Sequence, residues 1–272
     1  MSYEIEVTES HLKDLNIILR SLDVDITSLK RSHVLRRVRT RVMRVGKRTL
    51  DEYIVYLRGS EEEKNLLKHA FSINVTHFFR NQDTFELIKK EVLPLLARGT
   101  NRIKIWSAGC ADGAEPYSLA ILCHQIGLRP DRVTITATDY NNNSLEMARA
   151  GVYHESYLKE TPRDIKAKYF SPGPTPETVQ VDLMLRQYID LKRHNLITDH
   201  PLGRGMFDMV VCRNVLIYFT REQHEPIYKS FYEALRPDGV FVLGRSEVLS
   251  ANWRDRFTIY NSHHRISTKI KG

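Results

Sequence analysis

The sequence is short of the residues that mark several classes of protein. Only three of its 272 residues are cysteines, Cys110, Cys123 and Cys212, and none stands in a C-x-x-C spacing. This argues against a disulfide framework and a structural zinc, so we expect no metal and a reducing, cytoplasmic compartment. No apolar run approaches the roughly 18 residues of a membrane span, and MSYEIEVTES is too acidic for a signal peptide, so no membrane insertion is expected.

Acidic residues are absent from one stretch, residues 30–48 (KRSHVLRRVRTRVMRVGKR), which holds nine Lys or Arg. The whole chain carries +8, so the remainder carries 8 − 9 = −1. Valines recur at helical spacing and predict an apolar stripe, at Val34, Val38, Val42 and Val45. Arginines repeat that spacing on an adjacent face, at Arg37, Arg41, Arg44 and Arg48. A solvated face is one interpretation, but a single-sign row repels itself and favours an acidic partner.

The hydrophobic pattern changes along the chain. The first 70 or so residues predict helices in SHLKDLNIILRSL, the basic stretch, TLDEYIVYLRG and EEEKNLLKHAFS. From about residue 100, strands alternate with helices: RIKIW, EPYSLAILCHQIG, RVTITATD, NSLEMARAGVY, RQYIDLKRHNL, MFDMVVCRN, REQHEPIYKSFYEAL and GVFVLG. This alternation predicts a mostly parallel, doubly wound α/β sheet, whose ligands bind at the carboxyl ends of the strands. RFTIYNSHHRISTK predicts an antiparallel strand pair that closes the sheet.

One segment departs from the alternation. Residues 171–188 open with the proline and glycine cluster SPGPTPE, which forbids a helix. Their apolar residues then alternate with period two, at Val179, Val181, Leu183 and Leu185. We expect a small β insertion here.

The loop in KIWSAGCADGAEPYS, residues 104–118, lacks the third glycine of a G-x-G-x-x-G fingerprint. Gly109 and Gly113 let the backbone approach a ligand, while Asp112 and Glu115 would repel a pyrophosphate. A cationic ligand such as S-adenosylmethionine suits these acids better, although an acid at a helix start also interacts favourably with the helix dipole.

Two further strand ends carry candidate site residues. Asp139 ends the second strand, where an acid can bind both hydroxyls of a ribose, in NAD or in S-adenosylmethionine. CRNVLIYF follows the fourth strand and lacks the Asn/Asp-Pro-Pro-aromatic motif of many nitrogen methylases. A carboxylate acceptor, ionised at neutral pH with a pKa near ~4.3, needs orientation and no base. Tyr218 is a candidate to orient it; the alternative is a tyrosine packed at a helix start.

The link between the two halves, FSINVTHFFR, is expected to form a strap over a bound ligand. Phe78 and Phe79 are predicted to be core residues. The polar groups around them are Asn74, Thr76 and Arg80, and for Arg80 a structural role remains an equal alternative.

Taken together, NVTHFFR, WSAGCADGAEPYS, ATDYN, HNL and FDMVVCRNVLIYF resemble the chemotaxis receptor methyltransferase family, CheR, over nearly the whole chain. The resemblance implies a Rossmann-like class I methyltransferase with a helical domain over 1–80, a methyltransferase domain over 81–272 and the β insertion at 171–188. Members transfer a methyl group from S-adenosylmethionine to glutamate carboxylates on cytoplasmic helices of chemotaxis receptors, which yields a methyl ester and S-adenosylhomocysteine.

The resemblance also implies roles for single residues. The implied cofactor contacts are Asn74, Thr76, Arg80, Glu115, Asp139, Asn195, Leu196, Arg213 and Asn214. Arg80 and Tyr218 are similar to residues next to the transferred methyl group. Arg37, Arg41, Arg44 and Arg48 would dock on the acidic helical bundle of a receptor.

Some points stay open. Ala114 stands where many members carry an acid, and the proline-rich turn of the insertion leaves open whether it binds a receptor tail peptide. An NAD oxidoreductase, a non-catalytic adaptor and a nucleic-acid methylase are the alternatives. The basic charge is confined to one helix, so we expect no nucleic-acid partner, and a monomer.

Overall fold

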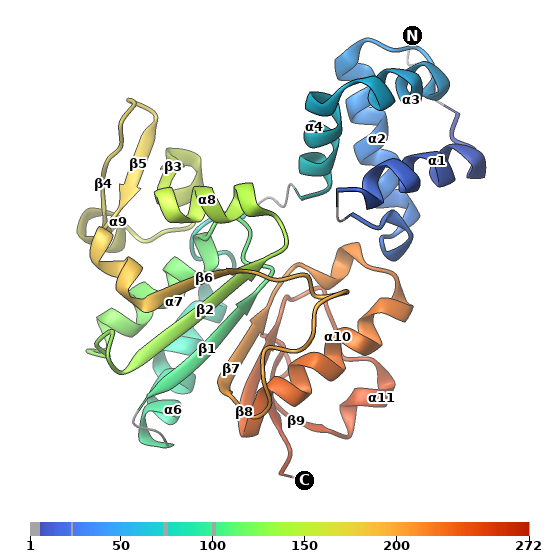
Figure 1. The fold of residues 1–272 in the computed structure, drawn as a ribbon. Coiled ribbons are helices and arrows are strands. Elements are labelled where there is room, and N and C mark those ends of the chain that lie inside the picture. Colours follow the sequence, from blue (N-terminus) through green and yellow to red (C-terminus); the bar gives the residue numbers. More distant parts are fainter. Residues whose placement is uncertain (1–5, 23, 73–75, 100–101, 272) are drawn as a thin grey trace. The chain divides into compact units, whose positions relative to one another are not determined.

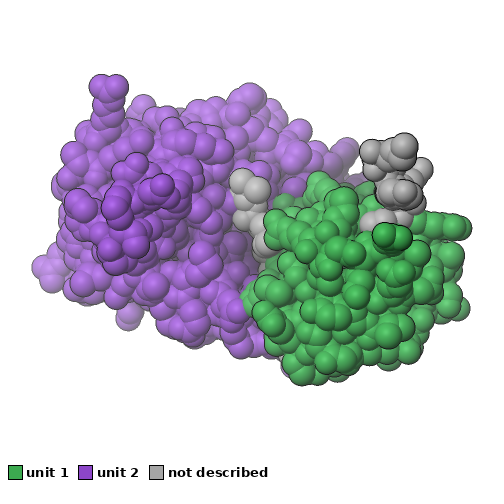
Figure 2. Space-filling model, turned by 90° about the horizontal axis from the view of Figure 1, so that it is seen from above, with its two compact units in different colours: residues 1–73, 218–223 green, residues 74–217, 224–272 purple. Residues whose placement is uncertain are grey.

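The computed structural model describes residues 6–22, 24–72, 76–99 and 102–271, which form two compact units. The helical unit comprises residues up to 73 together with 218–223, and the sheet unit comprises 74–217 and 224–272 (Figure 2). The division after residue 73 differs from the boundary at residue 80 expected from the sequence. Residues 76–80 of the strap therefore belong to the sheet unit.

The helical unit contains the four predicted helices (Figure 1), which are α1 (Glu9–Arg20), α2 (Arg31–Val45), α3 (Leu50–Gly59) and α4 (Glu61–Ser72). Threonine hydroxyls cap two of them: Thr8 Oγ1 accepts a hydrogen bond from the His11 amide, and Thr49 Oγ1 from the Glu52 amide. Three valines of the predicted stripe are buried in the core of this unit, Val34, Val38 and Val42.

The basic helix is shorter than its sequence pattern predicts. Gly46 has a φ of 74°, and its amide donates to the carbonyls of Val42 and Met43. A glycine in this left-handed conformation commonly ends a helix. Arg48 therefore lies beyond α2, and its placement in a helical arginine row was wrong.

Residues 218–223 join the helical unit through backbone contacts with the residues before α2. The Tyr218 carbonyl accepts a hydrogen bond from the Lys30 amide at 2.9 Å, and the Thr220 amide donates to the Ser28 carbonyl at 3.0 Å. Between them, Leu29 and Phe219 form an antiparallel bridge. Tyr218 thus belongs to the unit that carries the basic helix.

The sheet unit is built on the predicted, mostly parallel sheet (Figure 1). Its strand order is β6-β2-β1-β7-β8-β10-β9. The first five strands are parallel to one another, and β10 is antiparallel to both of its neighbours, β8 and β9. The strands are β1 (Ile103–Ala108), β2 (Val133–Asp139), β6 (Ile189–Arg193), β7 (Phe207–Cys212), β8 (Leu235–Leu243), β9 (Phe257–Asn261) and β10 (Ile266–Lys269). The doubly wound fold with a closing antiparallel pair is confirmed.

Helices cover both faces of this sheet. Figure 1 shows α7 behind the central strands and α10 in front of β7 and β8. The helices of the unit are α5 (Gln82–Leu87), α6 (Leu93–Gly99), α7 (Ala114–Gln125), α8 (Asn142–Ala150), α9 (Arg163–Tyr169), α10 (Arg221–Ala234) and α11 (Ala251–Arg254), and Ile88–Val92 is a π-helical turn between the first two. Within the described ranges, no helix is both long and apolar enough to span a membrane.

The β insertion is present, but its predicted extent was wrong. It is a three-stranded antiparallel sheet in the order β3-β5-β4, formed by β3 (Val152–His154), β4 (Phe170–Pro172) and β5 (Thr178–Val181). β3 was assigned to the end of a helix, which in fact stops before Gly151 in its left-handed conformation. Leu183 and Leu185 lie in a 3₁₀ helix (Leu183–Tyr188), which Asp182 caps by accepting a hydrogen bond from the Met184 amide through its carboxylate.

Candidate functional site

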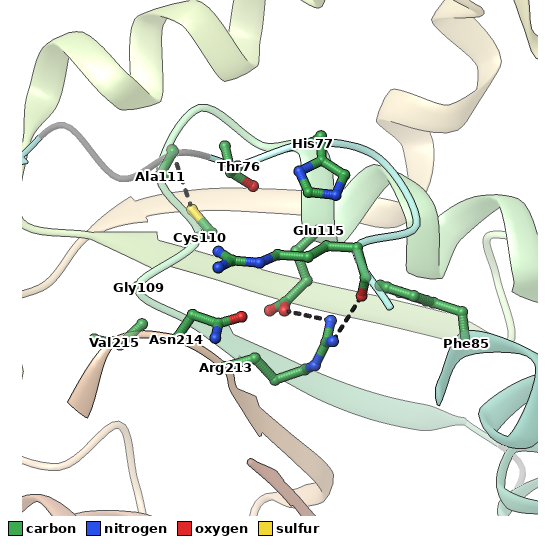
Figure 3. A pocket seen from close by; sticks show the side chains of 11 residues that line it. Thr76, His77, Phe85, Gly109, Cys110, Ala111, Glu115, Arg213, Asn214 and Val215 are labelled. Carbon is green, nitrogen blue, oxygen red and sulfur yellow. Dashed lines mark hydrogen bonds and ion pairs between the residues drawn. The ribbon is translucent and has the colours of Figure 1, made fainter. Parts of the chain in front are cut away.

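A pocket opens at the carboxyl edge of β1 and β7, inside the sheet unit (Figure 3). It encloses about 420 Å³ of space between its lining atoms, and part of this space is open solvent. Three segments line it: the strap with the helix that follows, the loop after β1 with the start of α7, and the loop after β7. The lining residues are Thr76, His77, Arg80, Phe85, Gly109, Cys110, Ala111, Glu115, Arg213, Asn214 and Val215.

Backbone conformations that side chains rarely adopt gather around this pocket. Phe79, Asn81, Ala111 and Asn214 all have φ between 49° and 61°. Gly109 has a φ of 70°, and a Cβ there would lie 2.6 Å from Cγ2 of Val215. Such conformations cost energy and concentrate at functional sites, which supports a ligand site here.

The second loop glycine has another role than the one predicted. Gly113 has a φ of 94°, and a Cβ there would lie 2.7 Å from the Cβ of Ala148 in α8. Gly113 is not a lining residue of the pocket. It therefore allows α8 to pack closely, and its approach to a ligand stays a prediction.

Glu115 and Arg213 meet inside the pocket. Glu115 Oε2 lies 3.6 Å from Arg213 Nη1, and Glu115 Oε1 accepts a hydrogen bond from Ser107 Oγ at 2.8 Å. Figure 3 shows both side chains pointing toward one another from α7 and from the end of β7. Burial raises the pKa of Glu115, and the positive charge of Arg213 opposes that rise. Since the pair is not in hydrogen-bond contact, both groups retain capacity for a ligand.

Arg213 also anchors the strap. Its Nη2 donates to the Arg80 carbonyl at 2.7 Å and to Asn81 Oδ1 at 2.9 Å, and its guanidinium lies 5.1 Å from the ring centre of Phe85. The Phe79 amide donates to Ser118 Oγ of α7. The strap is thereby held against α7 and against the loop after β7.

The two paired phenylalanines are core residues, as predicted. Phe78 is fully buried and packs edge-on against Tyr153 and Phe170, with ring centres 4.9 and 4.8 Å away. Phe79 is 2% exposed and lies 5.5 Å from Phe85.

Asp139 lies at the end of β2, beneath the loop after β1. Its Oδ2 accepts a hydrogen bond from the Ala111 amide and its Oδ1 from the Asn141 amide, both at 2.9 Å. Burial raises the pKa of Asp139 to about 6, against the lowering effect of these amides. Asp139 does not line the pocket itself, but a carboxylate oxygen can accept more than one hydrogen bond.

The next strand end holds two more predicted residues. Asn195 and Leu196 follow β6, whose Arg193 lies opposite Asp139 in the parallel register. The Asn195 amide donates to Asp199 Oδ2, and Asn195 Oδ1 accepts from the Ile197 amide. Both residues are half-buried and lie outside the pocket lining.

The remaining predicted cofactor and catalytic residues are divided. Thr76, Arg80, Arg213 and Asn214 line the pocket. Asn74 lies outside the described residues. Tyr218 belongs to the helical unit, where its ring centre is 4.7 Å from that of His33.

The predicted docking row is interrupted in the helical unit. Arg41 is buried, and its guanidinium binds Glu63 of α4 through Nε to Oε1 at 2.9 Å and Nη2 to Oε2 at 2.5 Å. Tyr53 adds a hydrogen bond to Glu63 at 2.7 Å. The assignment of Arg41 to a docking surface was therefore wrong. Arg37 is half-buried, whereas Arg44 and Arg48 are exposed.

Among the residues that were not predicted, one polar residue lines the pocket and one acid lies beside it. His77 lines the pocket, and its Nε2 lies 2.8 Å from Glu160 Oε1. Glu247 follows β8 and binds the loop after β7 through its carboxylate. The strand-end rule that selected Asp139 also applies to Glu247 in VLGRSE, so that signal was present in the sequence.

The charges of the pocket have both signs. Glu115 contributes a carboxylate, Arg80 and Arg213 contribute guanidinium groups, and Asn214 Oδ1 is buried with no hydrogen-bond partner among the described residues. S-adenosylmethionine carries an ammonium, a carboxylate and a sulfonium. One acid, two guanidinium groups and an amide can bind the charged groups of its amino-acid end.

The acids of the loop after β1 exclude a pyrophosphate less strongly than their sequence positions predict. Asp112 lies outside the pocket lining, and its Oδ2 accepts a hydrogen bond from the Tyr157 hydroxyl. Glu115 already has Arg213 beside it. The charge of the loop alone therefore does not distinguish the two kinds of cofactor.

One cluster of potential metal ligands lies elsewhere in the described part of the sheet unit. Ligand atoms of Asp83, His263 and His264 lie within 4.8 Å of one another. Arg245 already pairs with Asp83, and Thr84 Oγ1 lies 3.0 Å from His264 Nδ1. The guanidinium supplies the positive charge that a metal ion would bring, so we assign no metal here.

Comparisons with known proteins distinguish a methyltransferase from an NAD oxidoreductase. Residues 74–266 match the family model described as CheR methyltransferase, SAM binding domain. A chemotaxis protein methyltransferase of Listeria innocua is 32% identical over 245 residues, which cover 89% of this chain and 91% of the relative. A chemotaxis protein methyltransferase of Escherichia coli K12 is 30% identical over 266 residues, which cover 95% and 91%.

Proposed function

The chain belongs to the CheR methyltransferase family, and from this we propose that it methylates glutamate side chains of methyl-accepting chemotaxis receptors with S-adenosylmethionine as methyl donor. The observation that carries the proposal is that the pocket with Glu115 and Arg213 lies within the residues matched by the family model. The product is a glutamate methyl ester, which adjusts the signalling state of the receptor.

The residues that would hold S-adenosylmethionine come from four strand ends and the strap. Glu115 would bind the ammonium, the pocket arginines the carboxylate, and Asp139 the ribose hydroxyls. Thr76, Asn195, Leu196 and Asn214 complete the proposed set, and Asn74 stays a prediction from the resemblance. When bound, the cofactor supplies a methyl group activated by the adjacent sulfonium.

A carboxylate acceptor places few demands on the protein. A glutamate with a pKa near ~4.3 is ionised at neutral pH, so the enzyme needs no general base. It must hold the carboxylate in line with the methyl group and remove part of its water. Arg80 lines the pocket and carries the positive charge for this task, and Tyr218 is proposed to orient the acceptor through its hydroxyl.

The exposed part of the basic stretch, residues 30–48, is the proposed receptor surface. Arg44 and Arg48 are exposed and Arg37 is half-buried, in a stretch without acidic residues. The methylated regions of receptors are acidic helical bundles, so charge complementarity would orient the enzyme on them. Arg41 is left out of this surface because Glu63 already neutralises it.

The test is methyl transfer from labelled S-adenosylmethionine to purified receptor cytoplasmic fragments. We expect label on glutamate that mild base releases as methanol, because esters hydrolyse where methylated amines and amides do not. Base-stable label would contradict the glutamate assignment. Tight binding of S-adenosylhomocysteine without transfer would favour a non-catalytic adaptor, and label on nucleic acid would favour a nucleic-acid methylase.

A further inference from the structure

We propose that Glu247 is a positioning residue of this enzyme, which sets the loop after β7 in the conformation that presents Arg213 and Asn214 to the cofactor. The inference rests on the proposed function for its kinetic consequences. Its geometric basis is a single carboxylate that accepts four backbone hydrogen bonds, all between 2.7 and 2.9 Å.

The four donors are distributed evenly over the two oxygens. Oε2 accepts from the amides of Asn214 at 2.8 Å and Gly244 at 2.7 Å. Oε1 accepts from the amides of Val215 at 2.9 Å and Leu216 at 2.8 Å. Glu247 is only 4% exposed, so water does not compete for these bonds.

The topology explains why this carboxylate reaches the loop. β7 and β8 are parallel neighbours, and their last residues, Cys212 and Leu243, are register partners. The loops that follow them therefore start side by side. Glu247 lies only four residues beyond Leu243, so it links two adjacent strand ends at the edge where the pocket opens.

The loop conformation depends on an anion at this position. Asn214 has a φ of 59°, and three successive amides, of Asn214, Val215 and Leu216, point at one carboxylate. Such a run of converging amides forms an anion-binding nest. In this protein the anion is part of the chain, and without it three buried donors would lack an acceptor.

Gly244 is an independent observation in favour of this role, because a side chain at position 244 would occupy the space of the Glu247 carboxylate. A Cβ at Gly244 would lie 2.5 Å from Glu247 Oε2 and 2.8 Å from the Asn214 amide nitrogen. Both contacts are too short for real atoms. Glycine at this position therefore preserves the bonds between Glu247 and the loop.

The loop that Glu247 holds contributes three lining residues to the pocket. Arg213 lies beside Glu115 and anchors the strap, Asn214 carries a buried, unpaired Oδ1, and Val215 packs over Gly109. A displacement of this loop would therefore disturb all three segments that line the pocket. Because Glu247 is not itself a lining residue, it acts through these neighbours.

Glu247→Gln tests the idea with little change of shape. Each oxygen accepts two amide protons, so either orientation of the glutamine amide places an NH₂ group against two donors. We expect the affinity for S-adenosylhomocysteine, measured by calorimetry, to fall by roughly 10-fold or more. The KM for the methyl donor should rise and kcat should fall, while the KM for a receptor fragment stays within about two-fold.

A matched control separates positioning from general stability. Glu225 is also a carboxylate of the sheet unit and accepts hydrogen bonds from Ser250 Oγ and Trp253 Nε1, which lie beyond Glu247 in the chain and not in the loop after β7. Glu225→Gln should lower the melting temperature without changing cofactor affinity. If Glu247→Gln shows the same pattern as Glu225→Gln, the positioning role is overturned and Glu247 is merely structural.

Two further measurements keep the test decisive if Glu247→Gln folds poorly. Gly244→Ala should weaken cofactor binding in the same manner, because its methyl group displaces the carboxylate. In Glu247→Ala, added acetate should restore part of the cofactor affinity, whereas chloride at equal ionic strength should not. If neither holds, the proposal fails. A wild-type protein that binds S-adenosylhomocysteine but methylates no receptor would refute the proposed function alone, since the binding measurements still test Glu247.

Discussion

Both units of the protein bury an arginine beside a glutamate, but the two pairs differ in geometry. In the helical unit, Arg41 and Glu63 form two hydrogen bonds of 2.9 and 2.5 Å, and Tyr53 binds the same carboxylate. In the sheet unit, the nearest atoms of Arg213 and Glu115 are 3.6 Å apart, and both residues line a pocket. The charged groups of Arg41 and Glu63 hydrogen-bond to each other, and we call them the closed pair. The charged groups of Arg213 and Glu115 do not, so they can still bind a ligand, and we call them the open pair.

The difference shows how the same two residue types serve structure in one place and binding in another. A buried pair contributes little net stability but is costly to break, so the closed pair holds α2 on α4 without being available to a partner. The open pair is held apart because Arg213 is also bonded to the strap and Glu115 to Ser107. A ligand with both charges can enter such a pair without first breaking a direct bond.

The largest expected effect is on the closed pair. Glu63→Ala should lower the free energy of unfolding of the helical unit by about 3–5 kcal/mol, because Arg41 would remain buried without a counter-charge. Hydrogen exchange of the amides in α2, α3 and α4 during urea titration measures it. Glu62→Ala, one residue away and exposed, should change stability by less than about 0.5 kcal/mol. An equally small effect for Glu63→Ala would show that the pair is not closed.

A substitution in the open pair should change the affinity for the cofactor more than the stability of the fold. Glu115→Gln should reduce the affinity for S-adenosylhomocysteine by roughly 10- to 100-fold, the loss expected for a charged hydrogen bond. Calorimetry measures this directly, and Glu146→Gln on the exposed surface of α8 is the control. Unchanged affinity in Glu115→Gln would remove Glu115 from the binding set.

Asp139 extends the comparison to a buried acid whose carboxylate is bound by two backbone amides. Burial raises its pKa from 3.8 to about 6, so the folded protein binds this proton more tightly than the unfolded chain. Its contribution to stability is therefore present below about pH 4 and is lost as the pH rises to about 6. Cofactor binding should show the opposite trend, because ribose hydroxyls donate to the ionised carboxylate.

The affinity for S-adenosylhomocysteine should thus fall by about 10-fold between pH 7 and pH 5, since about a tenth of Asp139 is ionised one unit below its pKa. Calorimetry at both pH values tests this. Asp139→Asn should bind more weakly and lose that pH dependence. A wild-type affinity that is flat over this range would place the pKa or the ribose contact elsewhere.

The smallest effects concern the exposed arginines beside the closed pair. Arg44→Glu and Arg48→Glu should each raise the KM for a receptor fragment by about 3- to 10-fold at low ionic strength, with stability unchanged. Salt near 0.5 M should remove most of the difference by screening. Arg98→Glu, on α6, makes the same charge change in the sheet unit and should leave this KM unchanged. If none of the three variants changed the KM for the receptor fragment, the proposed docking surface would be refuted.

Much of the fold follows from local patterns. The strands of the sheet are short apolar runs between turn residues, and the four N-terminal helices carry 3.6-residue periodicity, so burial and backbone geometry agree locally. The errors occur where a single residue ends a pattern. Gly46 ends α2 before Arg48, and Gly151 ends α8 before β3, because glycine reaches positive φ without steric cost.

For the site, the positions of the residues could be predicted, but their interaction partners could not. The parallel α/β order follows from the amino-acid sequence alone, and so do the strand ends where Glu115, Asp139, Arg213 and Asn214 lie, because a parallel sheet brings its carboxyl ends to one edge. The partner of each charge could be identified only in the folded structure. Arg41 meets Glu63, 22 residues away, and Glu247 meets the amides of a loop more than 30 residues away. Such contacts depend on how the helices and strands pack against one another, and the hydrophobic periodicity of the sequence does not predict them.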